Sequence, residues 1–160
     1  MEIILLVITL AMLVFASYCD LKASVVPGWI TLPVIAVGLV LQLFRLSAAD
    51  YLIRIAAIVG LSLIYPLIMG GGDAKVLMSI MIMHGVGCSA LTLLFAELLV
   101  LGVHCLRDPA KTKQAVSKGL DAIAAMDLSG IKKDPDQKVV LFVPYLAAGF
   151  LITAFLLNIH

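Results

Sequence analysis

Apolar residues occur along the chain in long runs, separated by short polar or glycine-rich stretches. A helix that crosses a bilayer needs about 20 mainly apolar residues, and most of the runs approach this length. The pattern predicts helices at about 3–19, 27–44, 51–69, 74–84, 87–105 and 139–157. We therefore expect an all-α, polytopic membrane protein with about six transmembrane helices, organised as a single domain over residues 1–160.

The fourth apolar segment is the shortest. It holds about three helical turns at a rise of 1.5 Å per residue, so we expect it to start or stop within the membrane. Only Gly85 and Gly87 mark the boundary between the fourth and fifth segments. A topology with five spans is therefore the main alternative.

The composition strengthens the membrane interpretation. The chain is 63% hydrophobic and 13% charged, whereas an average soluble domain is about 45–50% apolar and about 25% charged. These values exclude disorder, a coiled coil, collagen and most water-soluble globular proteins. The net charge of +1 gives no support for a nucleic-acid partner. The three cysteines form no CxxC pair, so they predict neither a disulfide framework nor a zinc site.

The N-terminal apolar run does not have the features of a cleaved signal peptide. No Lys or Arg precedes it, and no small-x-small cleavage site follows it. We expect it to be retained as the first span.

A basic stretch at 106–138 separates the last two predicted spans. Its Lys and Arg residues are Arg107, Lys111, Lys113, Lys118, Lys132, Lys133 and Lys138. Asp108 and Pro109 are typical of a helix start, and the apolar spacing that follows predicts an amphipathic helix on the lipid surface. The positive-inside rule then places this loop, Lys22 and Lys75 in the cytoplasm, with Arg45 and Arg54 on the other side.

Three of the ten acidic residues are not in loops or at the chain ends. Asp20 ends the first predicted span, Asp73 opens the fourth, and Glu97 lies inside the fifth. The predicted topology brings Asp20 and Asp73 to the same membrane face. Two close carboxyl groups in a poorly solvated site share one proton. Such a pair can hydrolyse a peptide bond without a metal, and we expect no metal site or cofactor.

Three glycines, Gly70, Gly71 and Gly72, directly precede Asp73. Glycine costs roughly 0.5–1 kcal/mol relative to Ala within a helix, so a glycine run indicates a sharp turn or the close approach of another chain. A substrate strand beside the glycines is one interpretation. A re-entrant turn with Asp73 as a helix N-cap is the other.

The two aspartates lie in segments that resemble the type IV prepilin peptidase family. In the first segment, Asp20 is followed by Pro27, Trp29 and Thr31. The second, Gly70-Gly71-Gly72-Asp73-Ala74-Lys75, is similar to the family's GxGD motif with its small residue and Lys. A weaker likeness, from Lys138 to Pro144 and Gly149, lies near the last predicted span.

The resemblance implies an aspartic endopeptidase in the cytoplasmic membrane of a bacterium or archaeon. It implies that Asp20 and Asp73 are catalytic and that the partners are pilin-like or archaellin-like precursors, cut just before an apolar helix. The sequence leaves open whether the chain forms a homo-oligomer. The candidate substrate-binding residues are Gly70, Gly71, Gly72, Lys22, Lys75 and Pro27. For the two lysines, anchoring at the membrane interface is the alternative.

One departure from the family pattern concerns a second activity. Family members that also N-methylate the new terminus carry a cytoplasmic insert with cysteine pairs early in the chain. Here only about eight residues join the first two predicted spans, with no such cysteines. We therefore expect a small, peptidase-only form.

Two other function classes compete with this prediction. A presenilin-like protease shares the GxGD motif, but it is expected to hold its first Asp well inside a span, whereas Lys22 closely follows Asp20. A small transporter or channel subunit would use Glu97, which could equally be a hydrogen-bonded acid between helices. His84, His104 and His160 have no matched partners in the sequence, so we expect them to be structural or solvated.

Overall fold

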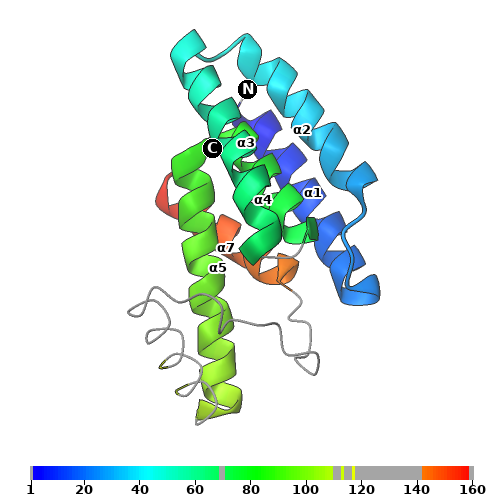
Figure 1. Ribbon diagram of the computed structural model, residues 1–160, viewed down its shortest axis with the longest axis vertical. Helices are drawn as coiled ribbons and strands as arrows, with labels where there is room; N and C mark the ends of the chain where they lie inside the picture. The colour runs from blue at the N-terminus through cyan, green and yellow to red at the C-terminus, as the bar shows by residue number, and fades with distance from the viewer. Residues whose placement is uncertain (1, 69–70, 110–112, 114–116, 118–141, 159–160) are drawn as a thin grey trace.

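The computed structural model describes residues 2–68, 71–109, 113, 117 and 142–158, without the side chains of 64–68. The described part is helical and contains no strand. Figure 1 shows the helices gathered into one bundle. Their bounds are α1 (Glu2–Ala23), α2 (Gly28–Leu43), α3 (Ala48–Ile68), α4 (Gly71–His84), α5 (Val86–Arg107) and α7 (Val143–Leu156).

All six predicted apolar segments are helices, and the differences lie at their ends. Helix α1 runs past its apolar part to Ala23, so Asp20 lies in the last turns of the helix rather than after it. Helix α4 begins at Gly71, which places Asp73 in its first turn. Two of the three glycines are therefore helical, and Asp73 is not the residue before the helix.

The boundary between α4 and α5 is sharp. Gly85 has a φ of +96°, and its N–H donates to the Met81 carbonyl, closing the last turn of α4. Glycine adopts this left-handed conformation without steric cost. Helix α5 then starts at Val86, and Gly87 lies inside it. The two segments are therefore separate helices.

The described helices agree with the membrane interpretation. Helices α1 and α5 are each long and apolar enough to cross a bilayer, while α2 and α7 are apolar but shorter. The all-α prediction is confirmed. The predicted number of six spans remains an expectation.

Helix α4 is the buried centre of the bundle. It packs against all the other described helices, α1, α2, α3, α5 and α7, and most of its side chains from Ala74 to Met83 are buried. The last carbonyl groups of a helix lack partners within the helix. In α4 they are satisfied from outside, because Arg54 Nη1 donates to the Ile82 carbonyl (2.9 Å) and Gln42 Nε2 to the Met83 carbonyl (2.7 Å).

Helices α5 and α7 approach each other closely at Gly149. A Cβ atom on Gly149 would lie 2.5 Å from the carbonyl oxygen of Thr92 and 2.9 Å from the amide nitrogen of Ala96. Only glycine allows this backbone contact. The same contact places the middle of α7 beside Ala96 of α5.

The charged residues separate to the two ends of the bundle as predicted. Arg45 pairs with Glu2 at the start of α1, and Arg54 reaches the end of α4. Lys22 and Lys75 lie at the opposite ends of those two helices. Helix α5 projects beyond the other helices at its C-terminal end (Figure 1).

The predicted amphipathic helix falls largely outside the described residues. Asp108 closes α5, because its N–H donates to the His104 carbonyl. Beyond it, Pro109, Lys113 and Ser117 have helical backbone. The surface helix therefore stays a prediction.

Candidate active site

Asp20 faces the interior of the bundle from α1. It is only 6% exposed, and its Oδ2 accepts a hydrogen bond from the Val143 backbone N–H at 3.2 Å. Val143 is the first residue of α7, whose own N-cap residue, Phe142, makes no side-chain cap. A helix N-terminus carries a partial positive charge. The start of α7 therefore orients the Asp20 carboxyl group, and this hydrogen bond offsets part of the cost of burying its ionised form.

Asp73 lies in the first turn of α4 at the same end of the bundle, ahead of the apolar part of that helix. Burial, and secondly the charge of Asp20, raise the pKa of Asp73 to about 6 from an ordinary value of 3.8. The charge of Asp20 acts on Asp73, and α1 packs against α4, so the two predicted catalytic carboxyl groups lie at the same end of the bundle. No group in the described ranges forms a hydrogen bond with the Asp73 carboxyl group.

The two aspartates thus have different environments. Asp20 accepts a backbone N–H, whereas Asp73 is partly buried beside the charge of Asp20. When environments separate two neighbouring carboxyl groups in this way, one can act as a base while the other holds a proton. The pair has the chemistry required for general acid and base catalysis on a peptide bond.

The glycines before Asp73 are not equivalent. A Cβ on Gly72 would lie 3.2 Å from Val26 Cβ and 3.3 Å from the Val26 amide nitrogen, whereas nothing lies within 4 Å of one on Gly71. The start of α4 therefore packs against the α1–α2 connection at Gly72. Gly70 lies outside the described residues.

The candidate lysines and Pro27 surround this end of the bundle. Lys22 is exposed, and its ammonium group lies 5.9 Å from the centre of the Tyr18 ring. Lys75 Nζ is 3.7 Å from the position of a Cβ on Gly28, at the start of α2. Pro27 is the N-cap of α2, and its carbonyl accepts the Ile30 N–H. The geometry places Lys75, rather than Lys22, against the segment that follows Asp20.

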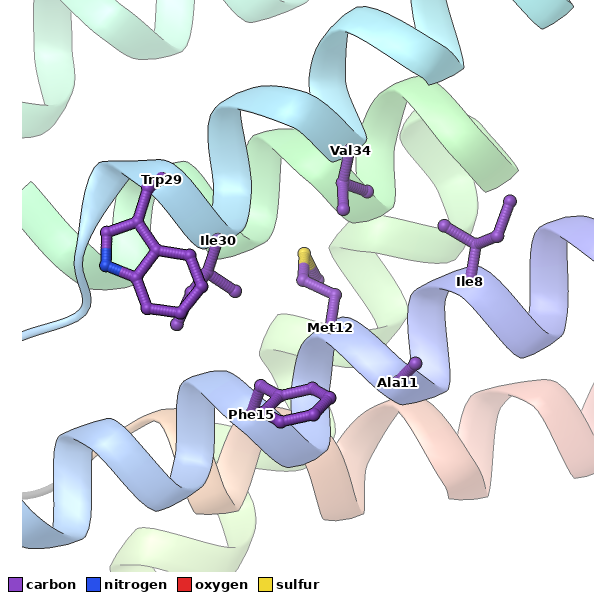
Figure 2. A pocket seen from close by; sticks show the side chains of 7 residues that line it. All are labelled: Ile8, Ala11, Met12, Phe15, Trp29, Ile30 and Val34. Atoms are coloured by element: carbon purple, nitrogen blue, oxygen red, sulfur yellow. The ribbon is translucent and has the colours of Figure 1, made fainter.

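An apolar groove of about 340 Å³ lies between α1 and α2 (Figure 2). Its lining residues are Ile8, Ala11, Met12 and Phe15 from α1, and Trp29, Ile30 and Val34 from α2. Figure 2 shows Phe15 and Trp29 together at one end, with Ile8 and Val34 at the other. Phe15 precedes Asp20 by five residues, which is about 7.5 Å along the helix. The groove therefore ends about one and a half turns before Asp20 along α1, on the exposed side of that helix.

Glu97 differs from its sequence-based interpretation. It is exposed on α5, and nothing in the described part of the chain forms a hydrogen bond or ion pair with it. Among the described helices it is therefore not a hydrogen-bonded acid, because the buried face of α5 is formed by Cys88, Ser89, Thr92 and Ala96 instead.

His84 is a satisfied core residue, as expected. Its Nε2 lies 3.0 Å from Thr9 Oγ1, and its ring centre is 5.1 Å from that of Phe150. His104 is exposed, and His160 lies outside the described residues. The three cysteines are free. Within the described ranges, no three His, Cys, Asp or Glu side chains gather in a way that could hold a metal ion.

Two residues that shape this site were not predicted from the sequence. The Val143 N–H donates a hydrogen bond to Asp20, which is 123 positions away in the sequence. Val26 packs against Gly72. Pro144, at the second position of α7, marks the start of that helix and could have pointed to Val143, since Pro favours the first helical turn. The position of Val26 had no local signal.

Comparison with known proteins agrees with the site. The model of the type IV leader peptidase family matches residues 7–105, which is more than half of the chain and includes both Asp20 and Asp73. No curated protein and no solved structure matches the chain. By the extent of this match, the chain belongs to the type IV leader peptidase family.

Proposed function

We propose that this protein is an aspartic endopeptidase that removes the short basic leader from pilin-like or archaellin-like precursors. The observation that carries the proposal is the convergence of α1, α4 and α7, which brings Asp20 and Asp73 into electrostatic contact at one end of the bundle. Family membership supports peptidase activity over a transporter.

The proposed chemistry assigns different roles to the two aspartates. Asp20, ionised and held by the Val143 N–H, accepts a proton from the attacking water. Asp73, whose pKa is about 6, holds the shared proton and donates a hydrogen bond to the carbonyl oxygen of the scissile peptide. Collapse of the tetrahedral intermediate breaks the C–N bond, and the leaving amine takes up a proton.

We place the precursor's apolar helix in the groove between α1 and α2. The precursor is cut just before its apolar helix. That helix must therefore run from the aspartates into the bilayer. The groove is lined by apolar side chains and ends near Asp20 on the same helix. The leader would then lie on the side of Lys22 and Lys75, which we propose faces the cytoplasm.

The short α1–α2 connection also supports a peptidase-only form. Ser24 to Pro27 are the only residues between these helices, so this connection has no room for a further catalytic insert. We propose that the new N-terminus is released without methylation by this chain.

The test uses the purified full chain in vesicles with a pilin-like precursor, and measures the leader-dependent size shift. Asp20→Asn and Asp73→Asn each keep the side-chain size but remove the proton-transfer chemistry. We expect each to lower the cleavage rate by at least about 10³-fold, since losing general acid–base catalysis alone costs about 10²–10⁴-fold.

Asp50→Asn is the matched control, because Asp50 is an exposed carboxylate at the start of α3. We expect it to cleave like the unmodified chain. Cleavage at the normal rate by either Asp20→Asn or Asp73→Asn would contradict the assigned dyad.

A further inference from the structure

Helix α5 carries one carboxyl group, that of Glu97, which has no polar partner among the described residues. Gly149, in the middle of α7, packs directly on Ala96, so the next residue, Glu97, lies at the middle of the bundle. Helix α5 is also one of the two helices that are long and apolar enough to cross a bilayer. Glu97 is therefore expected near the centre of the membrane.

The face that carries Glu97 points away from the rest of the bundle. The buried residues of α5 are Cys88, Ser89, Thr92 and Ala96, and Glu97 lies at an exposed position. An acidic side chain in contact with lipid is costly, so acids within spans almost always pair or line a polar cavity. Nothing among the described residues hydrogen-bonds to Glu97. Within the described part of the chain, Glu97 therefore has no polar partner, and its exposed carboxyl group is available to another chain.

The exposed face has the spacing of a helix-pairing seam. Its exposed positions recur every three and four residues: Gly87, Ala90, Leu94, Glu97, Leu101 and His104. Apolar or small residues at this spacing let two helices pack along each other. Gly87 has no atom within 4 Å of its Cβ position, which leaves room for a close approach, and small residues are enriched where membrane helices meet.

We propose that this seam pairs with the same seam on a second copy of the chain, giving a parallel two-fold dimer with the two Glu97 side chains facing each other. Copies inserted in the same orientation are related by an axis along the membrane normal, so each residue of the seam meets its own counterpart. A protonated carboxyl group both donates and accepts. Two glutamic acids therefore satisfy each other, which makes the seam self-complementary.

Cross-linking of the full chain in phosphatidylcholine vesicles at low protein-to-lipid ratio tests the dimer. Cys105, which is exposed on α5, is first replaced by Ser. Leu101→Cys then places a thiol on the seam, one turn after Glu97. Leu106→Cys is the matched control, because Leu106 is 88% exposed but lies nine residues after Glu97, on the opposite side of the helix.

We expect Leu101→Cys to form a disulfide-linked dimer on oxidation, and Leu106→Cys to form little. Adding Glu97→Leu should reduce the Leu101→Cys dimer about fivefold or more, since an interhelical hydrogen bond is lost. Glu97→Gln, which can still donate and accept, should retain it.

Equal cross-linking at both cysteine positions would overturn the proposal. An undiminished amount of dimer in the Glu97→Leu variant would also overturn it. So would a monomer in vesicles that contain only this chain, because the seam would then belong to a different partner. Helical content by circular dichroism checks that each variant is folded. Cross-linking does not depend on peptidase activity, so its outcome is separate from that of the leader-cleavage test.

Discussion

Asp20 and Asp73 are chemically identical residues that the fold makes different. Asp20 accepts a backbone N–H from the first residue of α7, and Asp73 is partly buried in the first turn of α4. A hydrogen bond to the charged form and a helix N-terminus both stabilise an ionised carboxylate. This difference supports one base and one proton carrier.

Asp73 should make the stability of the protein depend on pH. Its pKa is raised from 3.8 to about 6, so between about pH 4 and pH 6 the folded chain keeps a proton that the unfolded chain has lost. The contribution of Asp73 to the free energy of unfolding should therefore fall as the pH rises through this range, and level off above it; it is obtained as the difference between the unmodified chain and Asp73→Asn. Chemical denaturation in detergent at pH 4, 5, 6 and 7 measures the slope.

Asp73→Asn should remove this dependence, because the amide does not titrate. The variant should be more stable than the unmodified chain at pH 7, and similar to it at about pH 4. Asp50→Asn, at an exposed site, should leave the slope in place. An unchanged slope in Asp73→Asn would show that another group causes it.

Helix α4, which carries Asp73, is held by contacts at both of its ends. Helix α4 begins against Val26 at Gly72 and ends on donors from Arg54 and Gln42. Loss of a hydrogen bond that leaves a buried polar group unpaired lowers the free energy of unfolding by about 1–3 kcal/mol. The register of α4, and with it the position of Asp73, is therefore determined by side chains of α2 and α3.

The packing of α5 on α7 should be sensitive to one methyl group. Gly149→Ala would place Cβ 2.5 Å from the Thr92 carbonyl oxygen, and a backbone atom cannot move aside without shifting its helix. We expect a loss of about 1–3 kcal/mol in the free energy of unfolding, the usual cost of overpacking. Denaturant titration in detergent measures it.

Gly102→Ala is the control for this prediction, since nothing lies within 4 Å of the Cβ position on Gly102 in α5. Alanine is favoured over glycine in a helix by roughly 0.5–1 kcal/mol, so this variant should be as stable as the unmodified chain or more so. A similar loss in both variants would rule out the α5–α7 contact as the cause.

At the scale of the whole molecule, the described helices carry two distinct exposed surfaces. The groove between α1 and α2 runs along the helix that carries Asp20, and the α5 seam carries Glu97. We assign the first surface to the precursor and the second to another copy of the chain. Because they lie on different helices, both can be occupied at once.

Filling the groove should slow cleavage without affecting the aspartates. Ala11→Phe puts a ring into the groove, and we expect kcat/KM for a full precursor to fall about tenfold, equivalent to about 1.4 kcal/mol. A short soluble peptide that contains only the scissile region should be cut normally. Initial rates for both substrates check this.

Val14→Phe is the matched control, because Val14 is 68% exposed on α1 but does not line the groove. We expect it to cut the precursor at the normal rate. Equal slowing by the two substitutions would mean that the precursor does not use the groove.

The sequence by itself determined the solvent class, the approximate extent of every described helix, and the two segments that contain Asp20 and Asp73. These features are local, because apolar runs and motif spacing can be read without knowing what packs where. The helix ends were less well predicted: α1 continues past Asp20, and α4 starts before Asp73, since tertiary contacts extend them.

Only the tertiary structure decided how these segments meet. The bond from Val143 to Asp20 joins residues 123 positions apart. The contact of Gly72 with Val26 and the outward position of Glu97 likewise depend on how the helices pack. An apolar helix in a bilayer has several faces that a neighbour could cover, and the hydropathy of its sequence does not distinguish them. Close backbone approach and the pairing of buried polar groups select one arrangement.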